Sequence, residues 1–145
     1  MLPVSQPEDL RRRTKEFALR IVRLFQSLPN ADVSRTLGRQ LLRSGTSVAA
    51  NYRAVCRARS KAEFIAKLGI VLEEADETAF WLELLVETGV VPKSKLEKLQ
   101  EETDELVRIF SASWQTARRR PGKFWERKVT ARTGNRPIAQ SLNRE

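Results

Sequence analysis

The feature that most constrains this chain is a series of four long segments in which apolar residues recur at alternating steps of three and four. That spacing places apolar side chains on one face of an α-helix. Short breaks at residues 29–30, 59–60 and 89–92 separate the segments, and we see no alternation typical of strands. The sequence therefore predicts an all-α protein.

Each segment carries one continuous apolar seam. The first consists of Leu10, Thr14, Phe17, Ile21, Leu24 and Leu28, and the second of Leu37, Leu41, Ser44, Val48 and Val55. The third consists of Ile65, Leu68, Leu72, Ala75, Ala79, Leu82 and Val86, and the fourth of Leu96, Leu99, Thr103, Leu106, Phe110, Ser113 and Ala117. Such seams pack at about 20° in bundles whose short connections make successive helices antiparallel. We expect an up-down-up-down four-helix bundle over residues 1–119.

Three helix starts match the capping box, in which a serine oxygen accepts a helix amide and a glutamate three residues later reaches back. The pairs are Ser5 with Glu8, Ser60 with Glu63, and Ser94 with Glu97. Asp32 or Ser34 suits the start of the second helix, and Gly89 suits the left-handed position after the third.

Histidine is absent from the 145 residues, which removes the usual general base, the Ser-His and Cys-His pairs and the commonest metal ligand. We therefore expect no enzyme activity, no catalytic residue, no metal and no cofactor. The single Cys56 cannot form an internal disulfide and indicates a reduced, cytoplasmic protein. No apolar stretch approaches the roughly 20 residues that span a bilayer, so we expect no membrane partner.

The net charge of +9 is concentrated at the C-terminal end. From Arg118 onward there are nine basic and two acidic residues. Glycine and proline interrupt this stretch, and its low hydrophobicity cannot bury much apolar surface. We expect residues 120–145 to form a basic, flexible tail.

Charge also changes sign between the second and third segments. Seven basic residues and no acidic residue lie from Arg35 to Lys61, whereas the third segment is rich in carboxylates. Arg35, Arg39 and Arg43 follow at four-residue intervals and so form one stripe on a helix. Two interpretations stay open: ion pairing with the third segment, within or between subunits, or binding of nucleic-acid phosphates.

Under the second interpretation, arginines contact the nucleic-acid backbone rather than stack on bases, because aromatic residues are sparse beside them. The predicted nucleic-acid-binding residues are Arg35, Arg39, Arg43, Arg53, Arg57, Arg118, Arg119, Arg120 and Lys123.

Ser44, Ser47 and Asn51 lie near the second seam, and we interpret them as a buried hydrogen-bond cluster that fixes helix register.

The third segment has more apolar residues than one bundle core can cover. Ile70, Val71, Phe80, Trp81, Leu84 and Leu85 all fall outside its predicted seam. A helix that is apolar on more than one face is central in a larger protein or shared between subunits. We therefore predict a homo-oligomer with an interface formed by Ile70, Phe80, Trp81, Leu84 and Leu85.

The run from Arg43 to Leu85 resembles the bacterial four-helix-bundle family of 23S rRNA intervening-sequence proteins. The family pattern has a serine and, four residues later, an asparagine, matched by Ser47 and Asn51. An arginine-serine turn follows, matched by Arg57, Arg59 and Ser60, and then an E-x-x-E-T-x-x-W-L stretch, matched by Glu74, Glu77, Thr78, Trp81 and Leu82. The family usually has a glutamate where this chain has Ala54, so we expect this chain to lack any arginine pairing or ligand contact that the glutamate makes.

The resemblance implies assembly of the bundles into a ring, with five identical subunits. It also extends to the accessory proteins of diversity-generating retroelements, basic barrels that bind nucleic acid and a reverse transcriptase. RNA, DNA and a reverse transcriptase are thus expected partners by resemblance of fold.

Three functions follow as hypotheses. The first is a noncatalytic oligomeric bundle that binds RNA or DNA phosphates and assists an RNA or reverse-transcriptase complex. The second is a protein-protein scaffold that binds no nucleic acid. The third, which the missing ligands disfavour, is a nuclease whose Glu73, Glu74 or Glu77 would hold magnesium.

Overall fold

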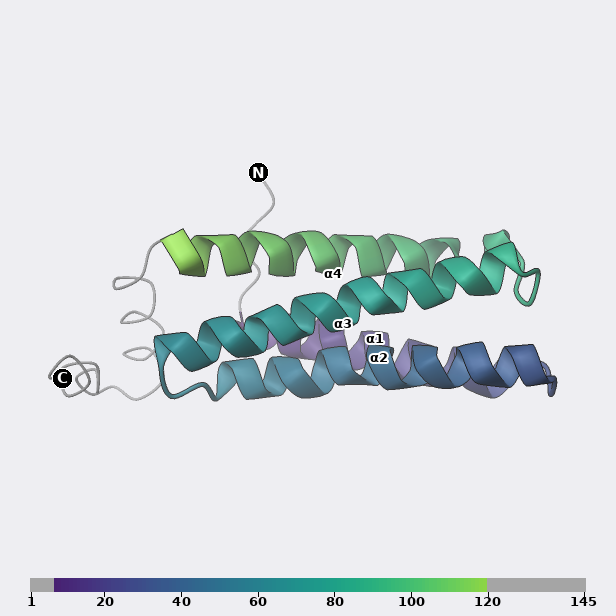
Figure 1. Cartoon of the computed structure of the whole chain (residues 1–145), viewed down its shortest axis with the longest axis horizontal. Helices are drawn as coiled ribbons and strands as arrows, with labels where there is room; N and C mark the ends of the chain where they lie inside the picture. The colour runs from purple at the N-terminus through teal and green to yellow at the C-terminus, as the bar shows by residue number, and fades with distance from the viewer. Residues whose placement is uncertain (1–6, 120–145) are drawn as a thin grey trace, which may run out of the picture.

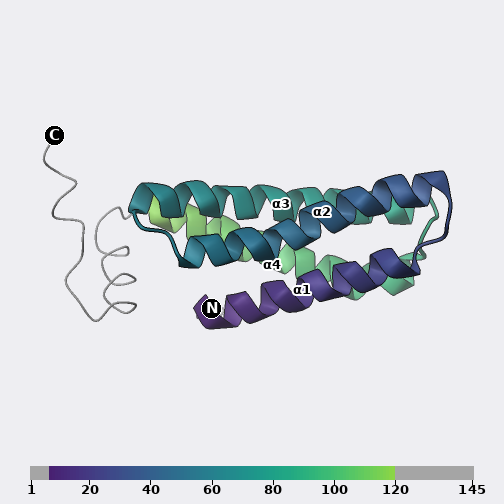
Figure 2. The same cartoon turned by 90° about the horizontal axis from the view of Figure 1, so that it is seen from below.

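The computed structural model describes residues 7–119, which form four α-helices joined by short turns (Figure 1). The helices are α1 (Pro7–Ser27), α2 (Asp32–Cys56), α3 (Lys61–Glu87) and α4 (Lys93–Arg119). Successive helices run antiparallel, and the described part contains no strand, so the predicted all-α bundle is confirmed (Figure 2). Ring assembly stays a prediction. Residues 120–145 lie outside the described residues, and the division at residue 119 is likewise untested.

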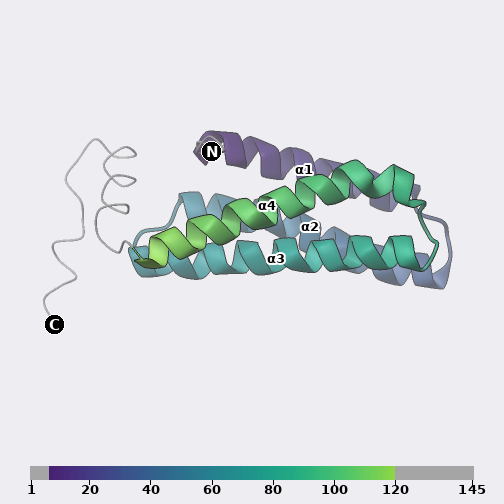
Figure 3. The ribbon, with the colours of Figure 1, turned by 90° about the horizontal axis from the view of Figure 1, so that it is seen from above.

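The helices pack mainly as sequential pairs, α1 on α2, α2 on α3 and α3 on α4. The backbones of α1 and α4 come close at far fewer positions, which leaves this edge of the bundle more open (Figure 3). Arg13 of α1 crosses the edge, donates a hydrogen bond to Glu102 of α4 and lies 3.3 Å from Glu105. Nothing in the spacing along α1 singled out this ion pair.

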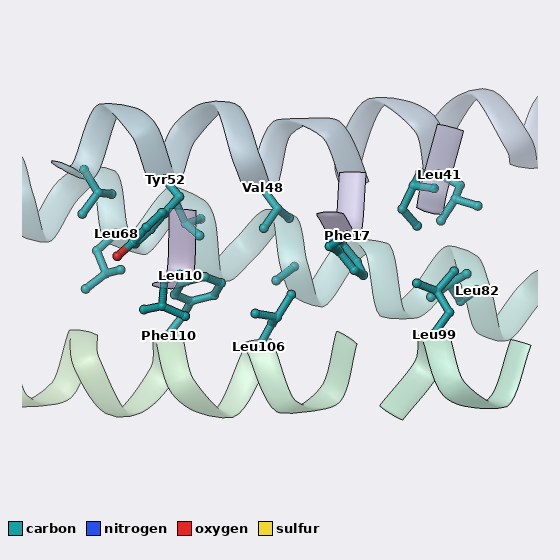
Figure 4. Close-up of a cluster of buried hydrophobic side chains, with 14 of the residues drawn as sticks. Leu10, Phe17, Leu41, Val48, Tyr52, Leu68, Leu82, Leu99, Leu106 and Phe110 are labelled. Carbon is teal, nitrogen blue, oxygen red and sulfur yellow. The ribbon is translucent and has the colours of Figure 1, made fainter. Parts of the chain in front are cut away.

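The core follows the predicted seams closely in the first and last helices. The buried residues of α1 are Leu10, Thr14, Phe17 and Ile21. Those of α4 are Leu96, Leu99, Thr103, Leu106, Phe110 and Ala117. Their side chains meet those of α2 and α3 in one continuous cluster (Figure 4). Thr14 and Thr103 tolerate this apolar setting because each hydroxyl donates to the carbonyl four residues earlier, at 2.8 and 2.7 Å.

The predicted seam of α3 is wrong in part. The buried residues are Phe64, Leu68, Val71, Ala75, Thr78, Leu82 and Leu85. This stripe shares only Leu68, Ala75 and Leu82 with the prediction. The other predicted residues, among them Ile65 and Leu72, flank the stripe and are half-buried. Because α3 is apolar on several sides, periodicity alone does not identify its core face.

The predicted seam of α2 is closer to the structure, but its first residue, Leu37, is only half-buried. Helix α2 approaches α1 through glycines. A Cβ at Gly45 would lie 2.8 Å from Cγ1 and 2.9 Å from Cγ2 of Ile21. A Cβ at Gly38 would lie 2.6 Å from Leu28 Cδ1. Close helix approach therefore depends on residues without side chains.

The helix ends confirm one of the predicted capping boxes. The Glu63 amide donates to Ser60 Oγ at 3.0 Å, and the Glu63 carboxylate accepts from the Arg59 amide at 3.1 Å. Gly89 has the expected positive φ, 74°.

Two other predicted caps are wrong. Ser94 lies inside α4, and α2 begins after Ala31 without a side-chain cap at its start. Ser5, of the third predicted box, lies outside the described residues. None of the four helices is both long and apolar enough to cross a membrane.

Candidate functional site

Charge is unevenly divided among the four helices. Helix α1 carries six basic and three acidic residues, and α2 carries four and one. Helix α3 reverses this balance with two basic and seven acidic residues, whereas α4 has six and five. The α1/α2 side of the bundle is therefore basic and α3 is acidic. Neither the charge stripe of α2 nor the carboxylates of α3 can be interpreted without the other helix.

The three stripe arginines of α2 are all exposed, but their environments differ. Arg35 lies 3.6 Å from Asp32 of its own helix, a long contact that solvent screens. Arg39 forms no ion pair with any residue in the range 7–119. Arg43 reaches across to α3 and contacts two carboxylates. The regular spacing of the three arginines in the sequence therefore does not give them the same ion pairs.

Arg43 is the centre of an interhelical polar cluster. It donates to Glu77 and lies 3.3 Å from Glu74 Oε2, while Trp81 Nε1 donates to Glu77 at 3.2 Å. The hydrogen bond from Arg43 lowers the pKa of Glu77, with a smaller contribution from Trp81. The same hydrogen bond raises the pKa of Arg43. The interhelical pairing predicted between α2 and α3 is therefore confirmed for Arg43.

This cluster also bears on the hypothesis of a magnesium nuclease. Two of the three carboxylates named for it, Glu74 and Glu77, are engaged by Arg43. In the described residues, no three His, Cys, Asp or Glu side chains lie close enough together to hold a metal ion.

The predicted hydrogen-bond cluster of α2 divides between two locations. Ser44 is fully buried, and its Oγ lies 3.0 Å from the Thr78 hydroxyl of α3. Thr78 also donates to the Glu74 carbonyl at 2.7 Å. Asn51, by contrast, donates to the Ser47 carbonyl within α2 at 2.9 Å, and both residues are half-buried. Of the three residues in this predicted cluster, only Ser44 forms a hydrogen bond with α3.

The surplus apolar residues of α3 also divide into two groups. Ile70 and Phe80 are 41% and 48% exposed, and Trp81 and Leu84 are half-buried. Leu85 is 0% exposed within a single chain, because it belongs to the buried stripe of α3. Its placement on an interface between subunits is therefore wrong, whereas the other four residues stay candidates.

The remaining predicted arginines gather near one end of the bundle. Arg53 and Arg57 are exposed near the end of α2, and neither forms an ion pair within residues 7–119. Arg118 and Arg119 are exposed at the end of α4. The guanidinium carbon of Arg118 lies 4.4 Å from the centre of the Trp114 ring, within the range of a cation-π interaction. Arg120 and Lys123 lie outside the described residues.

These features define a four-helix-bundle protein with a basic side, an acidic helix and a partly exposed apolar face. The model of the 23S rRNA-intervening sequence protein family matches residues 8–112. The chain belongs to this family, and the resemblance noted from Arg43 to Leu85 is confirmed.

A solved structure supports the same assignment. It is the crystal structure of a protein of unknown function from the S23 ribosomal protein family of Bacteroides thetaiotaomicron VPI-5482. The two chains share 37% sequence identity with a TM-score of 0.70, over 75% of this chain and 97% of the other. A search of curated proteins found no match.

Proposed function

We propose that this protein is a noncatalytic homo-oligomer that binds the phosphates of RNA or DNA. The observation that carries the proposal is the group of exposed arginines without ion pairs in the described part of the chain, Arg39, Arg53 and Arg57. Unpaired guanidiniums remain available for phosphate oxygens, which they can bind through two hydrogen bonds. Arg43 contributes less, because Glu74 and Glu77 already neutralise it.

Homo-oligomer formation is part of the same proposal. The exposed side chains of Ile70 and Phe80 lie on the most acidic helix, and the basic α1/α2 side offers a complementary charge. The resemblance to ring-forming relatives implies five subunits, and it extends the proposal to assistance of an RNA or reverse-transcriptase complex.

Binding to a labelled oligoribonucleotide, and to its DNA counterpart, across a salt series tests the proposal. We expect affinity to fall steeply as salt rises, because each neutralised phosphate releases counterions. Replacing Arg53 and Arg57 with Glu should weaken binding by at least about tenfold. The matched control replaces Lys98 and Arg108 of α4 with Glu and should retain wild-type affinity. Absence of binding, or affinity independent of salt, would contradict the proposal.

The second candidate function is a protein-protein scaffold that binds no nucleic acid, and the exposed apolar face of α3 favours it. Binding of the labelled oligoribonucleotide separates the two functions, because a scaffold should show no salt-dependent affinity for it. Charge reversal at Arg35 and Arg39 should split any oligomer that is held by pairing of α2 with a neighbouring α3.

A further inference from the structure

Three parts of the chain bring basic residues to the same end of the bundle. The antiparallel order places the end of α2, the start of α3 and the end of α4 together (Figures 1 and 3). The basic residues at these positions, which we term the basic pole, are Arg57, Arg59, Lys61, Arg118 and Arg119. The residues at 57–61 and those at 118–119 are far apart in the sequence, so only the topology brings the two groups together.

The charges of the basic pole are not neutralised locally. None of its five residues forms an ion pair within the range 7–119. The nearest carboxylate in sequence, Glu63, accepts the Arg59 amide and so serves the start of α3. The start of α1 also lies toward this end, but it brings both signs of charge, and Asp9 there pairs with Arg12.

The opposite end of the bundle provides a contrast. It carries the basic residues Arg23, Arg35, Lys93, Lys95 and Lys98, together with the acidic residues Asp32, Glu83, Glu87 and Glu97. The excess of positive charge is therefore much smaller at this end than at the basic pole. The chain also continues from Arg119 into residues 120–145, which contain seven basic and two acidic residues.

Arg118 is held in place by its neighbours. Its guanidinium lies against Trp114, and the Trp114 ring lies over Gly69 of α3, where an added Cβ would be 3.3 Å from Nε1. A guanidinium stacked on a ring keeps its N–H groups in the guanidinium plane, where they can still donate to a phosphate. This arrangement reduces the conformational entropy that Arg118 loses when it binds.

We propose that the basic pole is the principal phosphate-binding surface, so that nucleic acid docks at this end of the bundle rather than along the Arg35–Arg43 stripe. The inference rests on the proposed function and specifies where it occurs. Four of the five pole residues are arginines, whose planar donors fit phosphate oxygens. The large exposed apolar residues, Leu19, Val33, Ile70 and Phe80, all lie outside the pole. A membrane-binding surface would carry such residues, so the occupant is nucleic acid.

The test measures the salt dependence of binding of a labelled oligoribonucleotide to the full chain. The pole variant combines Arg57→Gln, Arg59→Gln and Lys61→Gln. The matched control combines Lys93→Gln, Lys95→Gln and Lys98→Gln at the opposite end. We expect the slope of log affinity against log salt to become shallower by about 2 in the pole variant, at roughly 0.7 for each phosphate contact of a single strand, and to stay unchanged in the control. The double variant Arg118→Gln/Arg119→Gln should make the slope shallower by about 1.4. This double variant provides the test if circular dichroism shows that the triple variant does not fold.

The outcomes separate the two proposals. If the wild type binds with a steep salt dependence and the pole variants keep its slope, the pole assignment is wrong and the proposed function stands. If the wild type does not bind at all, the proposed function itself fails. Tight binding to phosphatidylserine vesicles that the oligoribonucleotide cannot displace would assign the pole to a membrane and overturn the inference.

Discussion

Glu77 shows how a single residue depends on contacts that its own helix does not provide. Arg43 reaches it from α2 and Trp81 reaches it from the next turn of α3. The sequence favoured pairing between basic and acidic helices, but it left phosphate binding open as the alternative for Arg35, Arg39 and Arg43. The choice depends on which carboxylates of α3 face α2, and that depends on the rotation of α3 about its axis. Spacing along α2 contains no information about this rotation.

We expect Glu77→Gln to lower the free energy of unfolding by about 0.2–1 kcal/mol at pH 7, the range for a partly exposed ion pair. The folded-state pKa of Glu77 is lowered. Its contribution is thus complete above the unfolded pKa, about 4.3, and is lost as pH falls through the folded-state pKa. Urea unfolding at pH 7, 5 and 3 should show the difference between variant and wild type disappear with acid. Glu83→Gln, exposed on the same helix, is the control, and an equal effect there would contradict the assignment.

At the scale of elements, the seams of α1 and α4 were predictable and that of α3 was not. Polar residues surround the apolar stripes of α1 and α4, so only one face could be buried. Helix α3 has apolar residues on both flanks of its stripe, and Thr78, a core residue, looks less apolar than Ala79 beside it. Thr78 is buried because its hydroxyl bonds within α3 and meets Ser44. The buried face of α3 therefore includes a residue whose partner, Ser44, lies on another helix.

The glycines of α2 and α3 should respond differently to the same substitution. Gly45→Ala gains up to about 1 kcal/mol in helix propensity, but its Cβ meets both branches of the buried Ile21, and overpacking costs about 1–3 kcal/mol. We expect a net loss of about 1 kcal/mol in urea unfolding. Gly69→Ala meets only the Trp114 ring at 3.3 Å, and this half-buried ring needs to shift by only a few tenths of an ångström, so the substitution should be neutral or stabilising. Equal stabilisation by both substitutions would mean that α1 and α2 are not so closely packed.

The open edge between α1 and α4 should depend on Arg13. Its side chain is only 19% exposed and contacts Glu102 and Glu105. Arg13→Met keeps much of the apolar stem but leaves both carboxylates unpaired, and we expect a loss of about 1–3 kcal/mol. Hydrogen exchange should accelerate in both α1 and α4, because each of these helices packs mainly on one neighbour and loses its main polar contact across this edge. Arg12→Met, which removes pairs confined to α1, should leave exchange in α4 unchanged.

The whole molecule has an asymmetry that no single helix predicts. Its α1/α2 side is basic, α3 is acidic, and the exposed Ile70 and Phe80 lie on the acidic helix. Two different surfaces that complement each other favour head-to-tail contacts, which close into rings when the rotation permits. The composition predicted the surplus of apolar residues in α3. It could not separate Leu85, which completes the core, from Phe80, which faces outward, because that division depends on the register of α3.

The oligomer proposal leads to a test of the exposed apolar residues. Ile70→Glu/Phe80→Glu removes apolar surface and adds negative charge on the acidic helix, so we expect light scattering to report a smaller assembly or a monomer. Circular dichroism should remain helical, since both side chains are 41% or more exposed in the single chain. Lys98→Glu/Arg108→Glu is the control, because both residues are exposed on α4 and the substitution adds negative charge outside the two complementary surfaces. If the α4 variant dissociates and the double variant of α3 does not, the contact lies on α4 rather than α3. If the wild type is a monomer at all concentrations, then the exposed face of α3 serves a different partner and the homo-oligomer proposal is wrong.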